Sequence, residues 1–82
     1  MYRVVKRDGR IVDFEISKIA NAMKKAFDAT ETNYNQSVID FLAVMVTADF
    51  QPKIKDELIH IEDIQDSVES VLSRGGYEAV AK

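Results

Sequence analysis

Two periodicities in the hydrophobic and polar positions predict where strands and helices lie along this chain. Residues 2–6 and 11–14 are rich in β-branched and aromatic residues and alternate in part between apolar and polar. The stretch between them, residues 7–10, contains an Asp-Gly pair, which favours a tight primed turn between two strands. The pattern therefore predicts an N-terminal β-hairpin.

Apolar residues at helical spacing follow in three further segments. The first helix is predicted over residues 18–28, with Ser17 as its N-cap. The second carries an apolar stripe from Val38 to Phe50 that is too wide for a surface helix, so we expect it to be the central helix, ended by Pro52. The third has acidic residues in its first turn and ends at a Gly-Gly pair.

Two short segments complete the predicted topology. The apolar run 58–61 is predicted to form a third strand beside the hairpin. Residues 77–82 begin a fourth helix that stops without a cap, so we expect a single domain over residues 1–82 that is truncated in its last helix. The resulting fold is α+β, and its small core leaves only a modest margin of stability.

Composition narrows the classes of function. With 46% hydrophobic and 30% charged residues, the chain has the balance of a folded globular domain. The first ten residues are too charged for a signal peptide, and no run approaches the roughly 20 apolar residues of a membrane span. We therefore expect a cytoplasmic protein with no membrane partner. Cysteine is absent, which excludes disulfides, cysteine-ligated zinc and thiol chemistry within these residues.

The charges are unevenly distributed. A net charge of −3 argues against a nucleic-acid binder, yet residues 1–25 hold seven Lys/Arg against three acids. Lys6 and Arg7 stand at the end of the first predicted strand, and Lys18 stands at the start of the first helix, where backbone N–H groups are free. These cations can hold a polyphosphate. The alternative is that they only solvate a hairpin and a helix end.

Other chemistry has weaker support in the sequence. The chain contains neither a glycine-rich phosphate loop nor a dinucleotide-binding fingerprint, so we expect no nucleotide hydrolysis by those routes. His60 is interpreted as a strand residue rather than a catalytic base, since no nucleophile with an orienting acid is evident beside it. The acids of the third helix, Glu62, Asp63, Asp66 and Glu69, are expected to solvate that helix rather than to bind a metal.

A series of motifs adds outside support for the polyphosphate interpretation. The chain contains, in order, VKRDGR (5–10), KI (18–19), IEDIQDSVE (61–69) and GY (76–77). This series resembles the ATP-cone family, and the match covers essentially the whole chain. ATP-cones are regulatory nucleotide-binding domains at the N-terminus of many ribonucleotide reductase large subunits. The resemblance implies an α+β fold in which about four helices are capped by a short three-stranded sheet with an N-terminal hairpin.

The resemblance also assigns site residues by position. Lys6, Arg7 and Lys18 match the family's phosphate ligands. Its base and ribose contacts fall on Val12, Glu15, Ile19, Ile61 and Gln65. The family often has an acidic or polar residue where Val12 stands and a threonine where Ile61 stands. We therefore expect no direct hydrogen bond to the base from these two side chains.

The function implied by the resemblance is regulatory rather than catalytic. The domain is expected to bind ATP or dATP, with Mg²⁺ arriving on the nucleotide's phosphates, and to have no metal site of its own. It would report these nucleotides to the catalytic domain of a ribonucleotide reductase, an oxidoreductase of DNA replication, through subunit assembly that can include further copies of the chain. Residues 61–82 look closest to the anaerobic, glycyl-radical class, which reduces ribonucleoside triphosphates.

Two alternatives stay open. ATP-cones also occur in a bacterial transcriptional repressor, so the chain can be a cone fragment of such a protein. A repressor of that kind would carry a cysteine-ligated zinc ribbon before the cone. The other alternative is a small protein-interaction domain that binds no ligand.

Overall fold

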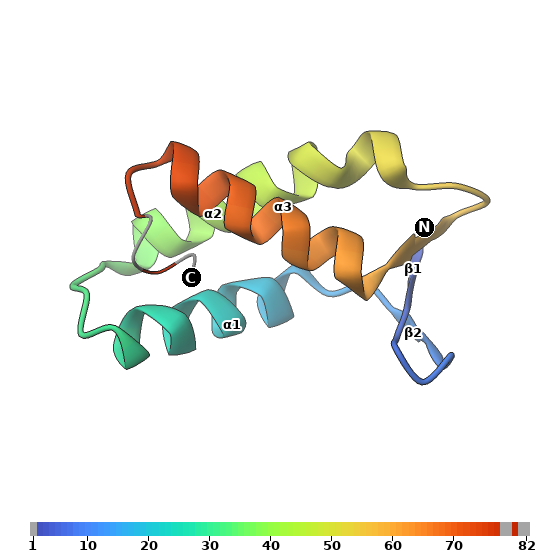
Figure 1. Ribbon diagram of the computed structural model, residues 1–82, viewed down its shortest axis with the longest axis horizontal. Coiled ribbons are helices and arrows are strands. Elements are labelled where there is room, and N and C mark those ends of the chain that lie inside the picture. The colour runs from blue at the N-terminus through green and yellow to red at the C-terminus, as the bar shows by residue number, and fades with distance from the viewer. Residues whose placement is uncertain (1, 78–79, 81–82) are drawn as a thin grey trace.

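The computed structural model, which describes residues 2–77 and 80, consists of a helical bundle with a small sheet at one end (Figure 1). The elements in chain order are β1 (Arg3–Val5), β2 (Ile11–Asp13), α1 (Ile16–Ala29), α2 (Gln36–Phe50), a 3-10 turn (Gln51–Lys53), β3 (Leu58–His60) and α3 (Ile61–Arg74). The predicted α+β class and the three-stranded sheet are confirmed. The described residues contain three α-helices rather than about four, and most of the predicted helix over 77–82 lies outside them.

The sheet is mixed, with strand order β2-β1-β3. β1 and β2 pair antiparallel, with Val4 opposite Val12, as the predicted hairpin requires. β3 pairs parallel with the other edge of β1, with Val5 opposite His60. The third strand is one residue shorter than predicted, because Ile61 already belongs to α3. With no loop between β3 and α3, the first turn of α3 is held beside the end of β1.

The hairpin closes through a different turn from the predicted primed one. The Gly9 N–H donates to the Lys6 carbonyl at 2.9 Å, and the Lys6 N–H donates to the Arg10 carbonyl at 2.8 Å. Gly9 has a φ of 88°, whereas Arg7 and Asp8 keep negative φ. This is a three-residue loop in which only the glycine adopts the left-handed conformation. The primed turn was wrong because it would have placed Asp8, as well as Gly9, at positive φ.

The start of α1 also differs from its prediction. The helix begins at Ile16, two residues earlier than expected, and its N-cap is Glu15 rather than Ser17. The Glu15 side chain accepts no capping hydrogen bond, although its carbonyl accepts from the Lys18 N–H at 3.1 Å. Ser17 lies inside the first turn and, within the described residues, makes no capping hydrogen bond. Lys18 therefore projects from the first turn of α1.

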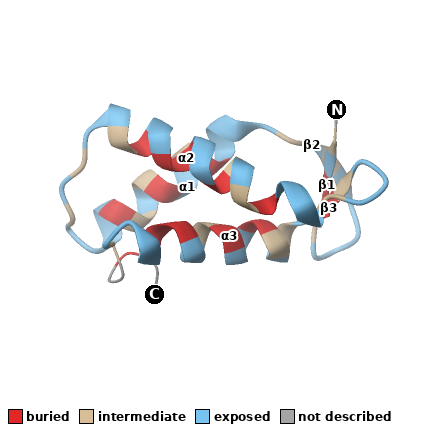
Figure 2. Ribbon diagram, turned by 90° about the horizontal axis from the view of Figure 1, so that it is seen from above, coloured by how far each residue is buried: buried red, intermediate tan, exposed pale blue. Residues whose placement is uncertain are grey.

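The core lies between the three helices, as the buried faces in Figure 2 show. α2 packs against both α1 and α3, which confirms its predicted central position. Its outward face, however, leaves Phe41 63% and Val44 58% exposed. No helix in the described part of the chain is long and apolar enough to cross a membrane.

An aromatic cluster fixes the sheet to the end of the bundle. The ring centroids of Tyr2 and Phe14 lie 4.9 Å apart, and those of Phe14 and Phe50 lie 5.7 Å apart. Burial raises the pKa of the Tyr2 phenol above its ordinary value, against the opposing effect of a hydrogen bond with Gln51. Because Phe50 ends α2, this cluster holds the hairpin rigidly against the helices that flank it.

Candidate functional site

A pocket of about 150 Å³ lies between the hairpin and the first turns of α1 and α3. Its walls are mostly branched or aromatic, with four charged side chains at the edges. The lining residues are Val4, Lys6, Val12, Asp13, Phe14, Glu15, Lys18, Ile19, Ile61 and Ile64. Six of the eight site residues predicted from the sequence are among them. This small, mostly apolar pocket has the character of a site for a weakly polar group.

A second, more polar pocket of about 310 Å³ adjoins the first and shares Lys6 and Ile61 with it. It is completed by Arg7, Asp8 and Gln65. The two remaining predicted residues, Arg7 and Gln65, are therefore found here. All eight predicted residues lie at one corner of the molecule, in two adjoining hollows of different polarity.

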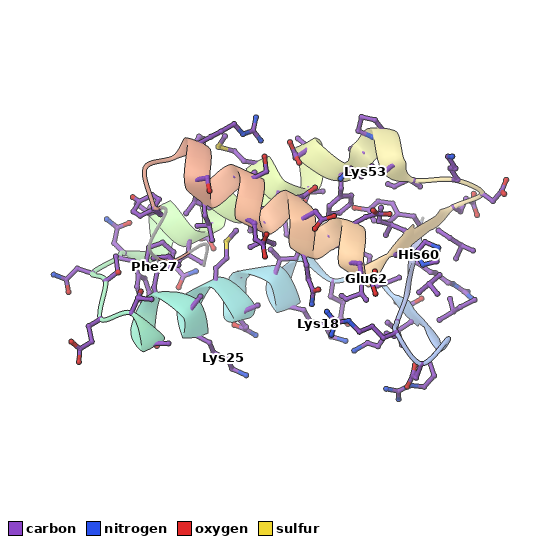
Figure 3. The ribbon with its side chains drawn as sticks, in the orientation of Figure 1. Lys18, Lys25, Phe27, Lys53, His60 and Glu62 are labelled. Carbon is purple, nitrogen blue, oxygen red and sulfur yellow. The ribbon has the colours of Figure 1, made fainter. Side chains whose placement is uncertain are left out.

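Three elements bring these residues together. β1 ends at Val5, so Lys6 and the loop that follows it emerge at the end of the sheet. The parallel pairing of Val5 with His60 then sets Ile61, the first residue of α3, beside Lys6. Lys18 and Glu62 both lie at the hairpin end of the bundle, whereas Lys25 lies in the far half of α1 (Figure 3).

The cations of this corner are only loosely held. Arg7 Nη2 donates to Gln65 Oε1 at 2.7 Å, and Arg7 Nε lies 3.9 Å from a Glu62 carboxylate oxygen. Lys18 Nζ lies 3.9 Å from Glu15 Oε2. All these ion-paired side chains are more than half exposed, so the pairs contribute little to stability.

Lys6 differs from the other two cations of the corner. It is half-buried, and within residues 2–77 and 80 it has no ion-pair partner at all. Arg10, by contrast, is tied to Asp8 by a 2.7 Å contact within the turn. An incoming anion can therefore engage Lys6, Arg7 and Lys18 without breaking a strong interaction.

Four lining residues of the apolar pocket were missed by the sequence-based assignment: Val4, Asp13, Phe14 and Ile64. The periodicity of the elements gives a signal for three of them, Val4, Phe14 and Ile64. Val4 pairs with Val12 across the hairpin, and Phe14 lies two residues beyond Val12 on the same side of the chain. Ile64 follows Ile61 by three residues on one face of α3.

A larger hollow of about 610 Å³ lies elsewhere, between α2 and α3. Its lining includes Val38, Phe41, Met45 and Val71, and none of the predicted site residues. Arg74 is its one charged lining residue, and this guanidinium donates to Asp49 Oδ1 at 2.8 Å. An apolar groove whose cation is already paired does not suit a polyphosphate, despite its greater size.

Comparison with known proteins identifies the family. The model of the ATP cone domain matches residues 2–82. The chain belongs to the ATP-cone family. This confirms the resemblance drawn from the VKRDGR and IEDIQDSVE motifs.

The relatives of this ATP-cone domain are much longer proteins. Ribonucleoside-diphosphate reductase subunit alpha of Chlamydia pneumoniae is 36% identical over 85 residues, and that of Chlamydia trachomatis serovar D is 38% identical over 88 residues. Each alignment covers 96% of this chain but only 8% of the relative. The predicted relation to ribonucleotide reductases is therefore confirmed.

The predicted anaerobic class is not supported. The relatives named above are diphosphate reductases, whereas the prediction implied a ribonucleoside-triphosphate reductase. Residues 61–82 lie within the stretch that matches the ATP cone domain, so they carry the family signal and do not by themselves separate one reductase class from another.

Proposed function

We propose that this ATP-cone domain binds ATP and dATP and acts as an allosteric effector domain of a ribonucleotide reductase. One observation supports it above all. The residues that match the family's phosphate and base contacts come from three elements and line two adjoining pockets, one polar and one apolar. The catalytic part of such a reductase is the proposed partner, with further copies of the chain as a second one.

The two pockets suggest how the nucleotide is divided between them. The triphosphate lies over the polar pocket, where Lys6 and Arg7 converge, with Lys18 approaching from α1. Charge-assisted contacts to phosphate are among the strongest hydrogen bonds in proteins. The base enters the apolar pocket against Val12 and Ile61, whose side chains add contact area without hydrogen bonds.

Carboxylates at the pocket edge provide a reason for adenine preference. Asp13 and Glu15 both line the apolar pocket, but the Asp13 carboxylate lies 3.6 Å from Arg3, which leaves Glu15 as the carboxylate for this role. An ionised carboxylate can only accept hydrogen bonds. Adenine presents a donor amino group where guanine presents an acceptor oxygen. A carboxylate facing that position therefore favours adenine and repels guanine.

Mg²⁺ is proposed to arrive with the phosphates. Within the described residues, no three His, Asp or Glu side chains cluster to hold a metal ion by themselves. Mg²⁺ commonly binds through substrate phosphates with only one or two carboxylates from the protein.

Regulation requires that ATP and dATP favour different arrangements of the domain and its partner. The two nucleotides differ by one 2′-hydroxyl. A ligand that binds two states equally does not shift the equilibrium between them. The 2′-hydroxyl therefore has to make a more favourable contact in one state than in the other. We propose that ATP favours an active assembly and dATP an inhibited one.

Calorimetric titration of the domain with ATP, dATP, GTP and inorganic tripolyphosphate tests the binding proposal. We expect saturable binding of ATP and dATP, and much weaker binding of GTP and tripolyphosphate. Equal affinity for all four ligands would mean that only phosphate is recognised. Absence of binding by any of them would leave the ligand-free interaction domain as the better description.

A further inference from the structure

Gln65 occupies a different part of the site from the one its sequence position suggested. By resemblance it was assigned to the base and ribose contacts, together with Val12 and Ile19. In the structure it lines the polar pocket with Arg7 and does not line the apolar one. Its Oε1 atom accepts a 2.7 Å hydrogen bond from Arg7 Nη2, across 58 positions of sequence.

We infer that Gln65 is a positioning residue for Arg7, holding the guanidinium over the polar pocket ready for phosphate, and is not a contact to the base. The inference rests on the proposed function, because it names the phosphate site of the same nucleotide. It assigns the hairpin loop and α3 a joint role, since Arg7 comes from the loop and Gln65 from the second turn of the helix.

The hydrogen-bonding capacity of Arg7 is compatible with this role. A guanidinium carries five N–H donors, and the bond to Gln65 uses one of them. The Nε atom is 3.9 Å from Glu62, too long for a strong hydrogen bond. The remaining donors stay free for a phosphate, which the guanidinium fork can bind through two parallel bonds.

The neutral charge of Gln65, the hydrogen-bond partner of Arg7, also favours phosphate binding. The Gln65 amide is neutral, so it orients the guanidinium without cancelling its positive charge. Glu62, one turn earlier on α3, adds a weak ionic contact at Nε, on the same edge of the guanidinium as Nη2. Arg7 is thus supported at two points by one helix face while keeping its attraction for an anion.

Preorganisation is the physical gain. The Arg7 side chain is 68% exposed, so without a partner it would sample many rotamers and lose that freedom when phosphate binds. Ordering a long side chain on binding costs enough to weaken affinity by about two- to tenfold. The hydrogen bond to Gln65 restricts the side chain in the ligand-free domain and so reduces that cost beforehand.

A double-mutant cycle tests whether Gln65 acts through Arg7. We expect Gln65→Leu to weaken ATP binding about two- to tenfold in the unmodified background, by isothermal calorimetry. In the Arg7→Ala background, the same substitution should change the affinity hardly at all, because there is no guanidinium left to position. Equal losses in both backgrounds would show that Gln65 contacts the nucleotide directly, and would overturn the inference.

The choice of ligand provides a second readout. Because the effect passes through a phosphate contact, Gln65→Leu should weaken inorganic tripolyphosphate and ATP by a similar factor and leave adenosine unaffected. A loss of affinity for adenosine as large as that for ATP would instead place Gln65 at the base and contradict the inference.

A measurement on the nucleotide-free domain separates this inference from the proposed function. Nuclear magnetic relaxation of the Arg7 Nε–H group should show greater mobility in Gln65→Leu than in the unmodified domain. Gln36→Leu is the matched control, since Gln36 bonds only its own helix neighbour Asp40 and lines neither pocket of the site. Unchanged mobility in Gln65→Leu would refute the inference, whereas increased mobility in a domain that binds no ATP would contradict the proposed function alone.

Discussion

Individual side chains at the hairpin corner combine accessibility with weak internal pairing. Lys18 and Arg7 are each about two-thirds exposed, and their contacts to Glu15 and Glu62 measure 3.9 Å. Lys6 is half-buried beside them. Such groups contribute little to folding, so they are available for binding at almost no cost in stability.

Lys6 and Lys18 should therefore affect ligand affinity far more than stability. Each charge-assisted contact to a phosphate contributes to the free energy of binding. Lys6→Ala or Lys18→Ala should therefore weaken ATP binding about ten- to a hundredfold. The thermal midpoint of the empty domain should barely change. Calorimetric titration of each variant, together with a melting curve, measures both effects.

Lys24→Ala and Lys25→Ala are the matched controls for that experiment. They remove the same charge from the far half of α1, outside both pockets of the site. If all four variants lose affinity equally, general electrostatic attraction explains the binding. If Lys6→Ala and Lys18→Ala bind ATP as tightly as the unmodified domain, the phosphate site is misassigned.

Two tight turns of this domain place residues at positive φ in different ways. The hairpin loop places its only positive φ at Gly9. The turn between Lys55 and Leu58, by contrast, has Asp56 at a φ of 52° and Glu57 at 62°. Two successive residues at positive φ form a primed turn, which favours Asn-Gly or Asp-Gly. This turn leads directly into β3 and thus helps to place α3 at the site.

Glu57→Gly should stabilise the domain. Glutamate is unfavourable in the left-handed region by roughly 1–2 kcal/mol, and glycine removes this strain. Glycine also has greater conformational freedom in the unfolded chain, which offsets part of the stabilisation. We expect a net gain of about 0.5–1 kcal/mol in the free energy of unfolding, measured by urea denaturation.

The same substitution in a helix should have the opposite sign. Glu69 is exposed within α3, so Glu69→Gly should destabilise by about 1 kcal/mol. A destabilising effect of Glu57→Gly would mean that the Glu57 side chain makes a contact worth more than the relief of backbone strain.

Across the whole molecule, α3 connects two regions of different character. Its first two turns contribute to the candidate nucleotide site, and its last turn contributes Val71 and Arg74 to the apolar groove beside α2. The domain measures 37 × 22 × 21 Å, with the sheet and the site at one end of the long axis (Figure 1). The candidate site therefore lies at the end of the bundle where the hairpin, α1 and α3 meet.

ATP should stabilise the whole domain by mass action. A ligand at one hundred times its Kd adds about 2.7 kcal/mol to the free energy of unfolding. For a domain of this size, that corresponds to a rise of roughly 10–20 °C in the melting temperature. Differential scanning calorimetry at increasing ATP, with sodium chloride of matched ionic strength as control, measures it. A rise that salt reproduces would be an ionic-strength effect rather than binding.

Much of this domain follows from interactions between residues close together in sequence. The alternation of residues 2–6 and 11–14 predicted the hairpin, and the apolar periodicity predicted the helices to within a few residues. The cations Lys6, Arg7 and Lys18 stood out because a strand end and a helix start lie near them. The motifs, read as a series, identified the ATP-cone family.

Other features depend on contacts between distant segments. The parallel pairing of β1 with β3 and the bond between Arg7 and Gln65 are not encoded in local preferences alone. Each is settled by packing, which brings residues up to 58 positions apart within hydrogen-bond distance. Local propensities differ by only about 1 kcal/mol, so burial and pairing across the fold decide between alternatives that the sequence leaves nearly equal in energy.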